Sequence, residues 1–132
     1  MAEVPSSSHI LEAIADEETI KLLRLIATSN GIDAQSLRSR AILTRKQYYT
    51  RMASLSSNGL ILSRNGKYYL TLFGKVIYAL VTRIGAAIEN IWKLQAIDGM
   101  ETSADIPEGE RDRFIQMMVV NPDIRQTLIA MH

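Results

Sequence analysis

The 132-residue chain contains no cysteine and only two histidines, His9 and His132. Without cysteine, disulfide bonds, thiolate metal sites and cysteine nucleophiles are excluded. Two histidines at opposite ends of the chain argue against a histidine metal cage and against a Ser-His-Asp triad. The sequence also lacks a glycine-rich phosphate loop and the H-E-x-x-H and G-x-S-x-G motifs. We therefore expect no metal site, no cofactor and no enzymatic activity.

Long hydrophobic runs are also missing, since no apolar stretch reaches the roughly 18 residues needed to cross a bilayer. The start of the chain, M-A-E-V-P-S-S-S-H, lacks the basic residues and apolar segment of a secretory signal. The 47% apolar and 22% charged content is typical of folded globular proteins. These observations predict a cytoplasmic protein without a membrane partner.

Acidic residues are absent from residues 34–88, although the net charge of the whole chain is only +1. This block holds nine Lys and Arg residues, whereas residues 1–33 and 89–132 each carry a net charge of −4. Such segregation creates a local positive potential, for which a polyanionic partner is the usual reason. The alternative is a solvated basic face that binds no partner.

Apolar spacing and capping residues predict three helices before residue 60. The first covers residues 16–29 and ends at Asn30-Gly31, because an αL stop favours these residues. A short helix follows over residues 33–40. Thr44 is then the expected N-cap of a basic helix that ends near Ser57. Two short helices with a tight connection form a helix-turn-helix pattern.

A β-hairpin is predicted over residues 60–71, with Asn65-Gly66 at its turn. Asn-Gly is favoured there because a type I′ turn needs two positive φ angles. The two-residue loop places Arg64 opposite Lys67. Like charges in that position are destabilising, unless the tip lies beside phosphates.

The hairpin is followed by a predicted long helix over residues 72–97, capped by Thr71. Its roughly 26 residues would extend about 39 Å, which is more than a small domain can cover. We therefore expect a homodimer, with contacts from Ile84, Ile88, Ile91 and Trp92. The alternative is a core helix that packs only on its own domain. Residues 98–109 resemble a linker, and two short helices are expected after them.

This order of elements, together with three local motifs, resembles the archaeal winged helix-turn-helix DNA-binding transcriptional regulators. The motifs are L-S-S-N-G-L-I at residues 55–61, the Asn-Gly wing, and Y-Y-L-T-L-F-G at residues 68–74. The resemblance extends over residues 11–97, and W-K-L-Q-A-I-D at residues 92–98 is more loosely similar to one subgroup.

The resemblance implies a mainly α fold with a small β-hairpin wing and a long C-terminal dimerisation helix. The expected domains are a flexible N-terminus at 1–10, a winged helix-turn-helix domain at 11–74, and a helical extension at 75–132. The implied activity is regulation of transcription by binding double-stranded DNA. A winged-helix module for protein–protein contacts within a larger transcription or chromatin assembly is the alternative. The sequence does not indicate a small-molecule effector.

The helix at residues 44–57 is the expected recognition helix, because Tyr48, Met52 and Leu55 share one face and leave the opposite face for the major groove. We expect Lys46 and Gln47 to read bases, and Arg45 and Arg51 to contact phosphates. The alternatives are packing on a neighbouring helix for Tyr49, and plain solvation for Arg38 and Arg40. The candidate DNA-binding residues are Arg38, Arg40, Thr44, Arg45, Lys46, Gln47, Tyr49, Thr50, Arg51, Arg64, Asn65, Gly66 and Lys67.

Overall fold

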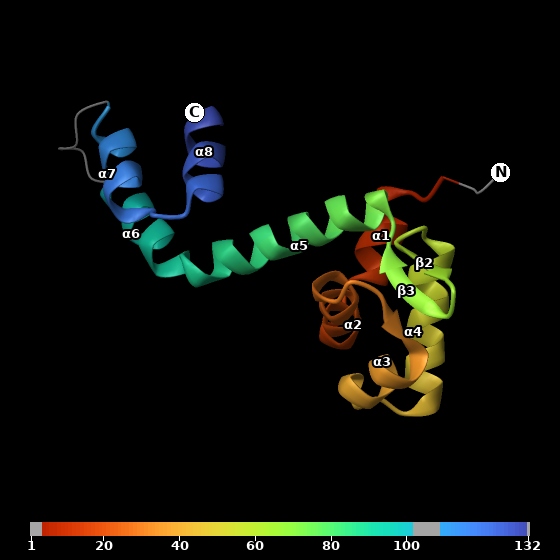
Figure 1. The fold of residues 1–132 in the computed structure, drawn as a ribbon. Coiled ribbons are helices and arrows are strands. Elements are labelled where there is room, and N and C mark those ends of the chain that lie inside the picture. Colours follow the sequence, from red (N-terminus) through yellow and green to blue (C-terminus); the bar gives the residue numbers. More distant parts are fainter. Residues whose placement is uncertain (1–3, 102–108, 132) are drawn as a thin grey trace. The chain divides into compact units, whose positions relative to one another are not determined.

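The structure is a computed structural model that describes residues 4–101 and 109–131. The fold is mainly helical with one small antiparallel sheet (Figure 1). In chain order the elements are α1 (Ser7–Ala13), α2 (Glu17–Thr28), β1 (Ile32–Asp33), α3 (Ala34–Ala41), α4 (Arg45–Ser57), β2 (Ile61–Arg64), β3 (Lys67–Leu70), α5 (Leu72–Glu89), α6 (Ile91–Glu101), α7 (Glu110–Met118) and α8 (Pro122–Ala130).

The chain divides into two compact units, Met1–Ala79 and Leu80–His132. The boundary lies inside α5, five residues beyond the expected limit at residue 74. Each unit has its own cluster of buried apolar side chains. The first unit is therefore a separate body that carries α1 to α4 and the sheet.

The three helices predicted in the first half are confirmed as α2, α3 and α4, and the N-caps predicted at Asp33 and Thr44 form, with a further N-cap at Asp16. Asp16 accepts a hydrogen bond from the Thr19 N–H at 2.8 Å, and Asp33 accepts one from the Ser36 N–H at 2.8 Å. Thr44 caps α4. Each helix begins where the side chain of its N-cap residue satisfies a free backbone N–H group.

The predicted hairpin is also confirmed, including its register. Arg64 pairs with Lys67, and both residues of the turn have positive φ angles, 53° at Asn65 and 76° at Gly66. The short strand β1 pairs with the other side of β3, which gives a sheet with the order β1-β3-β2. The sequence did not predict β1, because two residues are too few to show an alternating pattern.

The core of the first unit lies between α2, α3, α4 and the sheet. Leu22, Leu23 and Leu37 have no exposed surface, and Tyr48, Met52 and Leu55 of α4 point into the same cluster as predicted. Burying a large apolar side chain contributes about 1.5–3 kcal/mol. The core therefore determines which face of α4 remains in solvent.

The prediction of a flexible N-terminus at residues 1–10 is wrong from residue 7 onward. Residues 7–10 form the first turn of α1, where the Ser6 hydroxyl accepts a hydrogen bond from the His9 N–H at 3.2 Å. Ile10 is buried and joins the core of the first unit. A single apolar anchor and one cap therefore order this part of the N-terminal segment.

The single helix expected over residues 72–97 is wrong, because Asn90 separates α5 from α6. The Asn90 side-chain amide donates to the Ala86 carbonyl at 2.8 Å, and its backbone N–H is shared between the Ala86 and Ala87 carbonyls at 3.2 Å. Such local bonds compete with a regular helical ladder. Thr71 does cap α5, since its hydroxyl accepts a hydrogen bond from the Gly74 N–H at 2.9 Å.

The second unit is organised by the apolar residues that follow this break. Ile97 of α6 is buried with Ile115, Val119 and Ile124, which come from α7, its C-terminal end and α8. The two predicted short helices are thus confirmed as α7 and α8. Of the predicted linker, residues 98–101 belong to α6, and residues 102–108 lie outside the described residues. No helix among the residues described here combines the length and apolar character that a membrane crossing requires.

Replacing Gly74 by alanine should destabilise the first unit. The added Cβ would collide with the backbone carbonyl of Leu60, which no side-chain movement can relieve. We expect a loss of about 1–3 kcal/mol in the free energy of unfolding, measured by urea titration. Gly85→Ala is the matched control in the same helix, because nothing lies within 4 Å of its new Cβ and it should gain up to about 1 kcal/mol. Equal stability of the two variants would contradict the packing of α5 on Leu60.

Candidate nucleic-acid interface

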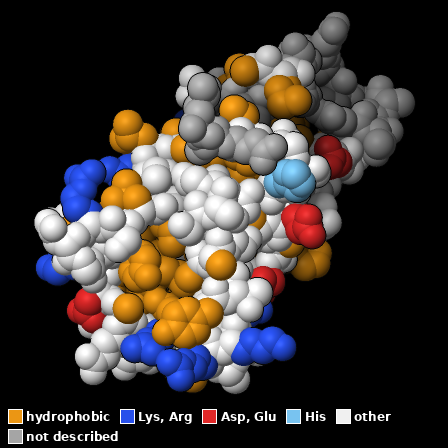
Figure 2. All heavy atoms as spheres, turned by 90° about the vertical axis from the view of Figure 1, so that its right-hand side faces the viewer, with side chains coloured by type: hydrophobic (Ala, Val, Ile, Leu, Met, Phe, Trp, Pro, Cys, Tyr) orange, Lys and Arg blue, Asp and Glu red, His pale blue; other side chains and the backbone are white. Residues whose placement is uncertain are grey.

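The exposed face of α4 carries the first group of candidate residues. Tyr48 and Met52 are turned into the core, so Arg45, Lys46 and Thr50 point into solvent. Figure 2 shows Lys and Arg side chains gathered around hydrophobic surface at the lower end of one face of the molecule. The burial pattern predicted for α4 thus leaves Arg45 and Lys46 on an accessible side of the helix.

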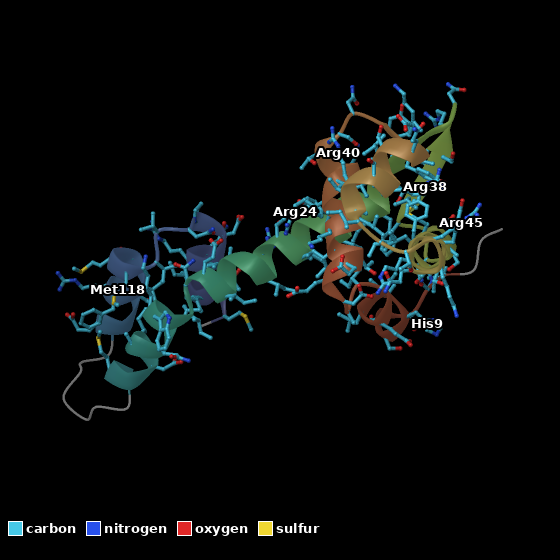
Figure 3. The ribbon with its side chains drawn as sticks, turned by 90° about the horizontal axis from the view of Figure 1, so that it is seen from below. His9, Arg24, Arg38, Arg40, Arg45 and Met118 are labelled. Carbon is cyan, nitrogen blue, oxygen red and sulfur yellow. The ribbon has the colours of Figure 1, made fainter. Side chains whose placement is uncertain are left out.

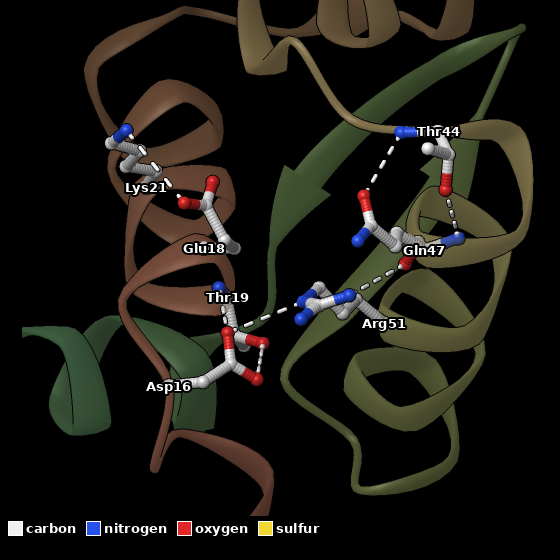
Figure 4. A network of polar contacts seen from close by, with 7 residues as sticks. All are labelled: Asp16, Glu18, Thr19, Lys21, Thr44, Gln47 and Arg51. Atoms are coloured by element: carbon white, nitrogen blue, oxygen red, sulfur yellow. Dashed lines mark hydrogen bonds and ion pairs between the residues drawn. The ribbon is translucent and has the colours of Figure 1, made fainter.

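A capping box fixes the first turn of α4 (Figure 4). The Thr44 hydroxyl accepts a hydrogen bond from the Gln47 N–H at 3.2 Å, and the Gln47 side-chain oxygen accepts one from the Thr44 N–H at 3.1 Å. This arrangement satisfies two backbone donors. It also occupies the oxygen that Gln47 would need for a bidentate contact with adenine, the base-reading role predicted for it.

Arg51 connects α4 to the start of α2. Its Nε lies 3.2 Å from an Asp16 carboxylate oxygen, and its terminal nitrogen donates to the Gln47 carbonyl at 3.2 Å (Figure 4). The Arg51 side chain is 23% exposed. The structure thus places Arg51, which was predicted to contact phosphate, in an ion pair within the protein.

Arg45 and Tyr49 form a stacked pair on the exposed face. The Arg45 guanidinium lies 5.8 Å from the centre of the Tyr49 ring, within the range of a cation–π contact. Tyr49 is 50% exposed and makes a T-shaped contact with the Tyr48 ring at a centroid distance of 5.3 Å. Tyr49 therefore packs against its own helix, while half of its surface stays accessible.

The hydroxyl of Tyr48 is buried and has no hydrogen-bond partner among the described residues. Burial, together with the neighbouring phenol of Tyr68, raises the pKa of Tyr48 to about 12. The side chain is thus neutral at physiological pH, and its ring forms the inner support of Tyr49.

The wing supplies the second group of candidate residues. Arg64, Asn65, Gly66 and Lys67 are all exposed, and neither basic side chain forms an ion pair within the described part of the chain. Two like charges at a hairpin tip repel each other. An anion beside the tip would remove this penalty.

Arg38 and Arg40 lie in the last turn of α3 but at different places. Arg38 is close enough to Tyr48 of α4 to influence its phenol, whereas Arg40 lines a groove with Lys21 and Arg24 of α2. The view in Figure 3 shows the same separation. The structure therefore places Arg38 near Tyr48 of α4 and Arg40 beside α2.

The four candidate dimer residues are all exposed within the described chain. The exposed fractions are 55% at Ile84, 63% at Ile88, 43% at Ile91 and 80% at Trp92. Leu80 and Ile84 also line an apolar groove of about 520 Å³ that α6 and α8 complete. An ion pair between Arg83 and Asp123, at 3.9 Å, lies among its lining residues.

Comparison of the chain with models of protein families, with curated proteins and with solved structures gives no match. Among the described residues, no group of three or more His, Cys, Asp or Glu side chains is placed to hold a metal ion.

Replacing Asp16 by asparagine should remove a pH-dependent part of the stability. Burial disfavours the charged form of Asp16, but hydrogen bonds from Thr19 and Arg51 and the Arg51 charge outweigh it and lower the pKa of Asp16 below 3.8. A lowered pKa stabilises the fold above pH 3.8, and that contribution is lost as the pH falls through the folded-state pKa. Asparagine keeps the helix cap.

We expect Asp16→Asn to be less stable than wild type in urea at pH 7, and the difference to shrink at pH 3 and below. Glu17→Gln is the control, because it removes an acid from the same helix turn that has no ion pair within the described residues. A difference between Asp16→Asn and wild type that stays constant from pH 7 to pH 2 would contradict the ion pair.

Proposed function

We propose that this protein is a transcriptional regulator that binds double-stranded DNA as a homodimer through a winged helix-turn-helix. In this proposal α4 enters the major groove, and the hairpin of β2 and β3 contacts the backbone or the minor groove. The observation that carries the proposal is one accessible basic surface on α4, together with an unpaired, like-charged wing in a stretch without acids.

The dimensions of α4 fit the proposed role. A single α-helix fits the major groove of B-DNA, and residues near its N-terminus commonly contact base edges. Arg45, Lys46, Tyr49 and Thr50 occupy the first two turns of α4 and are exposed. The packing of α4 on β2 places the hairpin beside the helix (Figure 1).

Electrostatics favour DNA over a protein partner. Arg45 and Lys46 stand at the positive end of the α4 dipole, where cations are unfavourable and the first turn holds no acid. The like-charged pair at the wing tip adds a second unfavourable contact. Phosphates would convert both into favourable contacts.

The homodimer rests on the exposed apolar residues of α5 and α6. Burying a large apolar side chain contributes about 1.5–3 kcal/mol, so four of them on each chain can offset the entropy of association. A dimer with twofold symmetry would present two recognition helices to half-sites about 34–36 Å apart.

We expect the affinity for a random-sequence duplex to fall as salt increases. About four to six phosphate contacts per subunit predict a slope of about −4 to −5 per subunit for log affinity against log salt. Fluorescence anisotropy with a labelled duplex measures this slope. The double variant Arg64→Ala/Lys67→Ala should make the slope less negative by about 2 per subunit, whereas Lys75→Ala, which lies outside the proposed surface, should change it little. No binding at low salt would favour the protein–protein module instead.

The intact protein at micromolar concentration should sediment at twice its monomer mass of 14.8 kDa. The double variant Ile84→Glu/Ile88→Glu should sediment as a monomer, because it would bring four carboxylates into one apolar contact. Lys93→Glu, a charge change at an exposed position of α6, should leave the dimer intact. A wild-type protein that sediments at 14.8 kDa would exclude the dimer.

A further inference from the structure

The polar side chains of α4 are not equally available for contacts with bases. The Gln47 side-chain oxygen is held by the capping box, and the Arg51 guanidinium is held between Asp16 and the Gln47 carbonyl. These bonds within the protein hold both side chains in place, and either side chain would lose them if it turned toward a base. Arg45 and Lys46 are the remaining basic residues of α4, and both are exposed.

Arg45 differs from Lys46 because its side chain packs on other side chains of α4. Tyr48 is only 2% exposed and is held in the core, Tyr49 stands edge-on against it at 76°, and Arg45 lies over the Tyr49 ring. This chain of three side chains connects the guanidinium to the core. Lys46 has no ring contact or ion pair among the described residues.

The chemistry of the two cations also favours Arg45 over Lys46 for contact with a base. A guanidinium is planar and presents paired donors that match O6 and N7 of guanine, whereas an ammonium acts as a flexible point charge. A side chain that is ordered before binding also loses less entropy when it binds. An ordered arginine in the first turn of α4 is therefore suited to a base, and a free lysine to a phosphate.

We propose that Arg45, positioned by Tyr49, is the residue that reads guanine, and that Lys46 contacts the phosphate backbone. This inference rests on the proposed DNA-binding function. It reverses the roles predicted from the sequence, where Lys46 and Gln47 were to read bases and Arg45 a phosphate. Tyr49 acts here as a positioning residue.

The test is selection of bound duplexes from a random-sequence pool, followed by sequencing, for the full-length wild type and its variants. Wild type should enrich guanine at one position of each half-site. Arg45→Lys keeps the charge but should reduce the preference for guanine at that position by about tenfold or more. Lys46→Ala should weaken binding to every sequence while it keeps the guanine preference.

The positioning role of Tyr49 is tested with a matched pair of variants. Tyr49→Phe keeps the ring and should keep the guanine preference, whereas Tyr49→Leu removes the ring and should reduce it. Thermal unfolding verifies that both variants are folded, which we expect because half of the Tyr49 surface is exposed. A purely structural role would change the two variants' melting temperatures but not their guanine preference.

The outcomes separate this inference from the function on which it rests. If wild type binds no duplex at low salt, the DNA-binding proposal fails and the inference fails with it. If wild type selects a sequence and Arg45→Lys selects the same guanine equally well, only the inference is overturned. Loss of the guanine preference in Lys46→Ala but not in Arg45→Lys would overturn it as well.

Discussion

The first unit depends on the burial of one face of α4. Tyr48, Met52 and Leu55 lie in the core with residues of α2 and α3, and this contact determines the rotation of the helix about its own axis. A rotation of one residue, about 100°, would turn Tyr49, Ala53 and Ser56 toward the core in place of Tyr48, Met52 and Leu55. Everything proposed for the exposed face follows from that orientation.

Polar contacts then hold several side chains of α4 in place. The ion pair between Arg51 and Asp16 joins α4 to α2, and the capping box closes the first turn of α4. These contacts remove Arg51 and Gln47 from the set of free side chains. The accessible chemistry of α4 is therefore narrower than its sequence indicates, because several of its polar groups hold the fold together.

Local structure was predictable where a short stretch of residues decides the outcome. Asp33 and Thr44 cap the helices they were expected to cap, because capping depends on the N-cap residue and the next three positions. The register of the hairpin was correct because a two-residue Asn-Gly turn permits one pairing. The prediction of one helix over residues 72–97 was wrong. The apolar periodicity continues through Asn90, but local hydrogen bonds of Asn90 end α5 there.

Residue types and near neighbours were enough to predict α2, α3 and α4, the hairpin of β2 and β3, the buried face of α4 and the lack of acids in residues 34–88. These properties depend on residue type and on neighbours within a few positions. The folded structure was needed to show that Arg51 is engaged by Asp16, 35 residues earlier in the chain, and that Ile97 belongs to a second core with Ile115 and Ile124. Ion pairs and core contacts join residues distant in sequence, and no local pattern reports which of several charged or apolar side chains will meet.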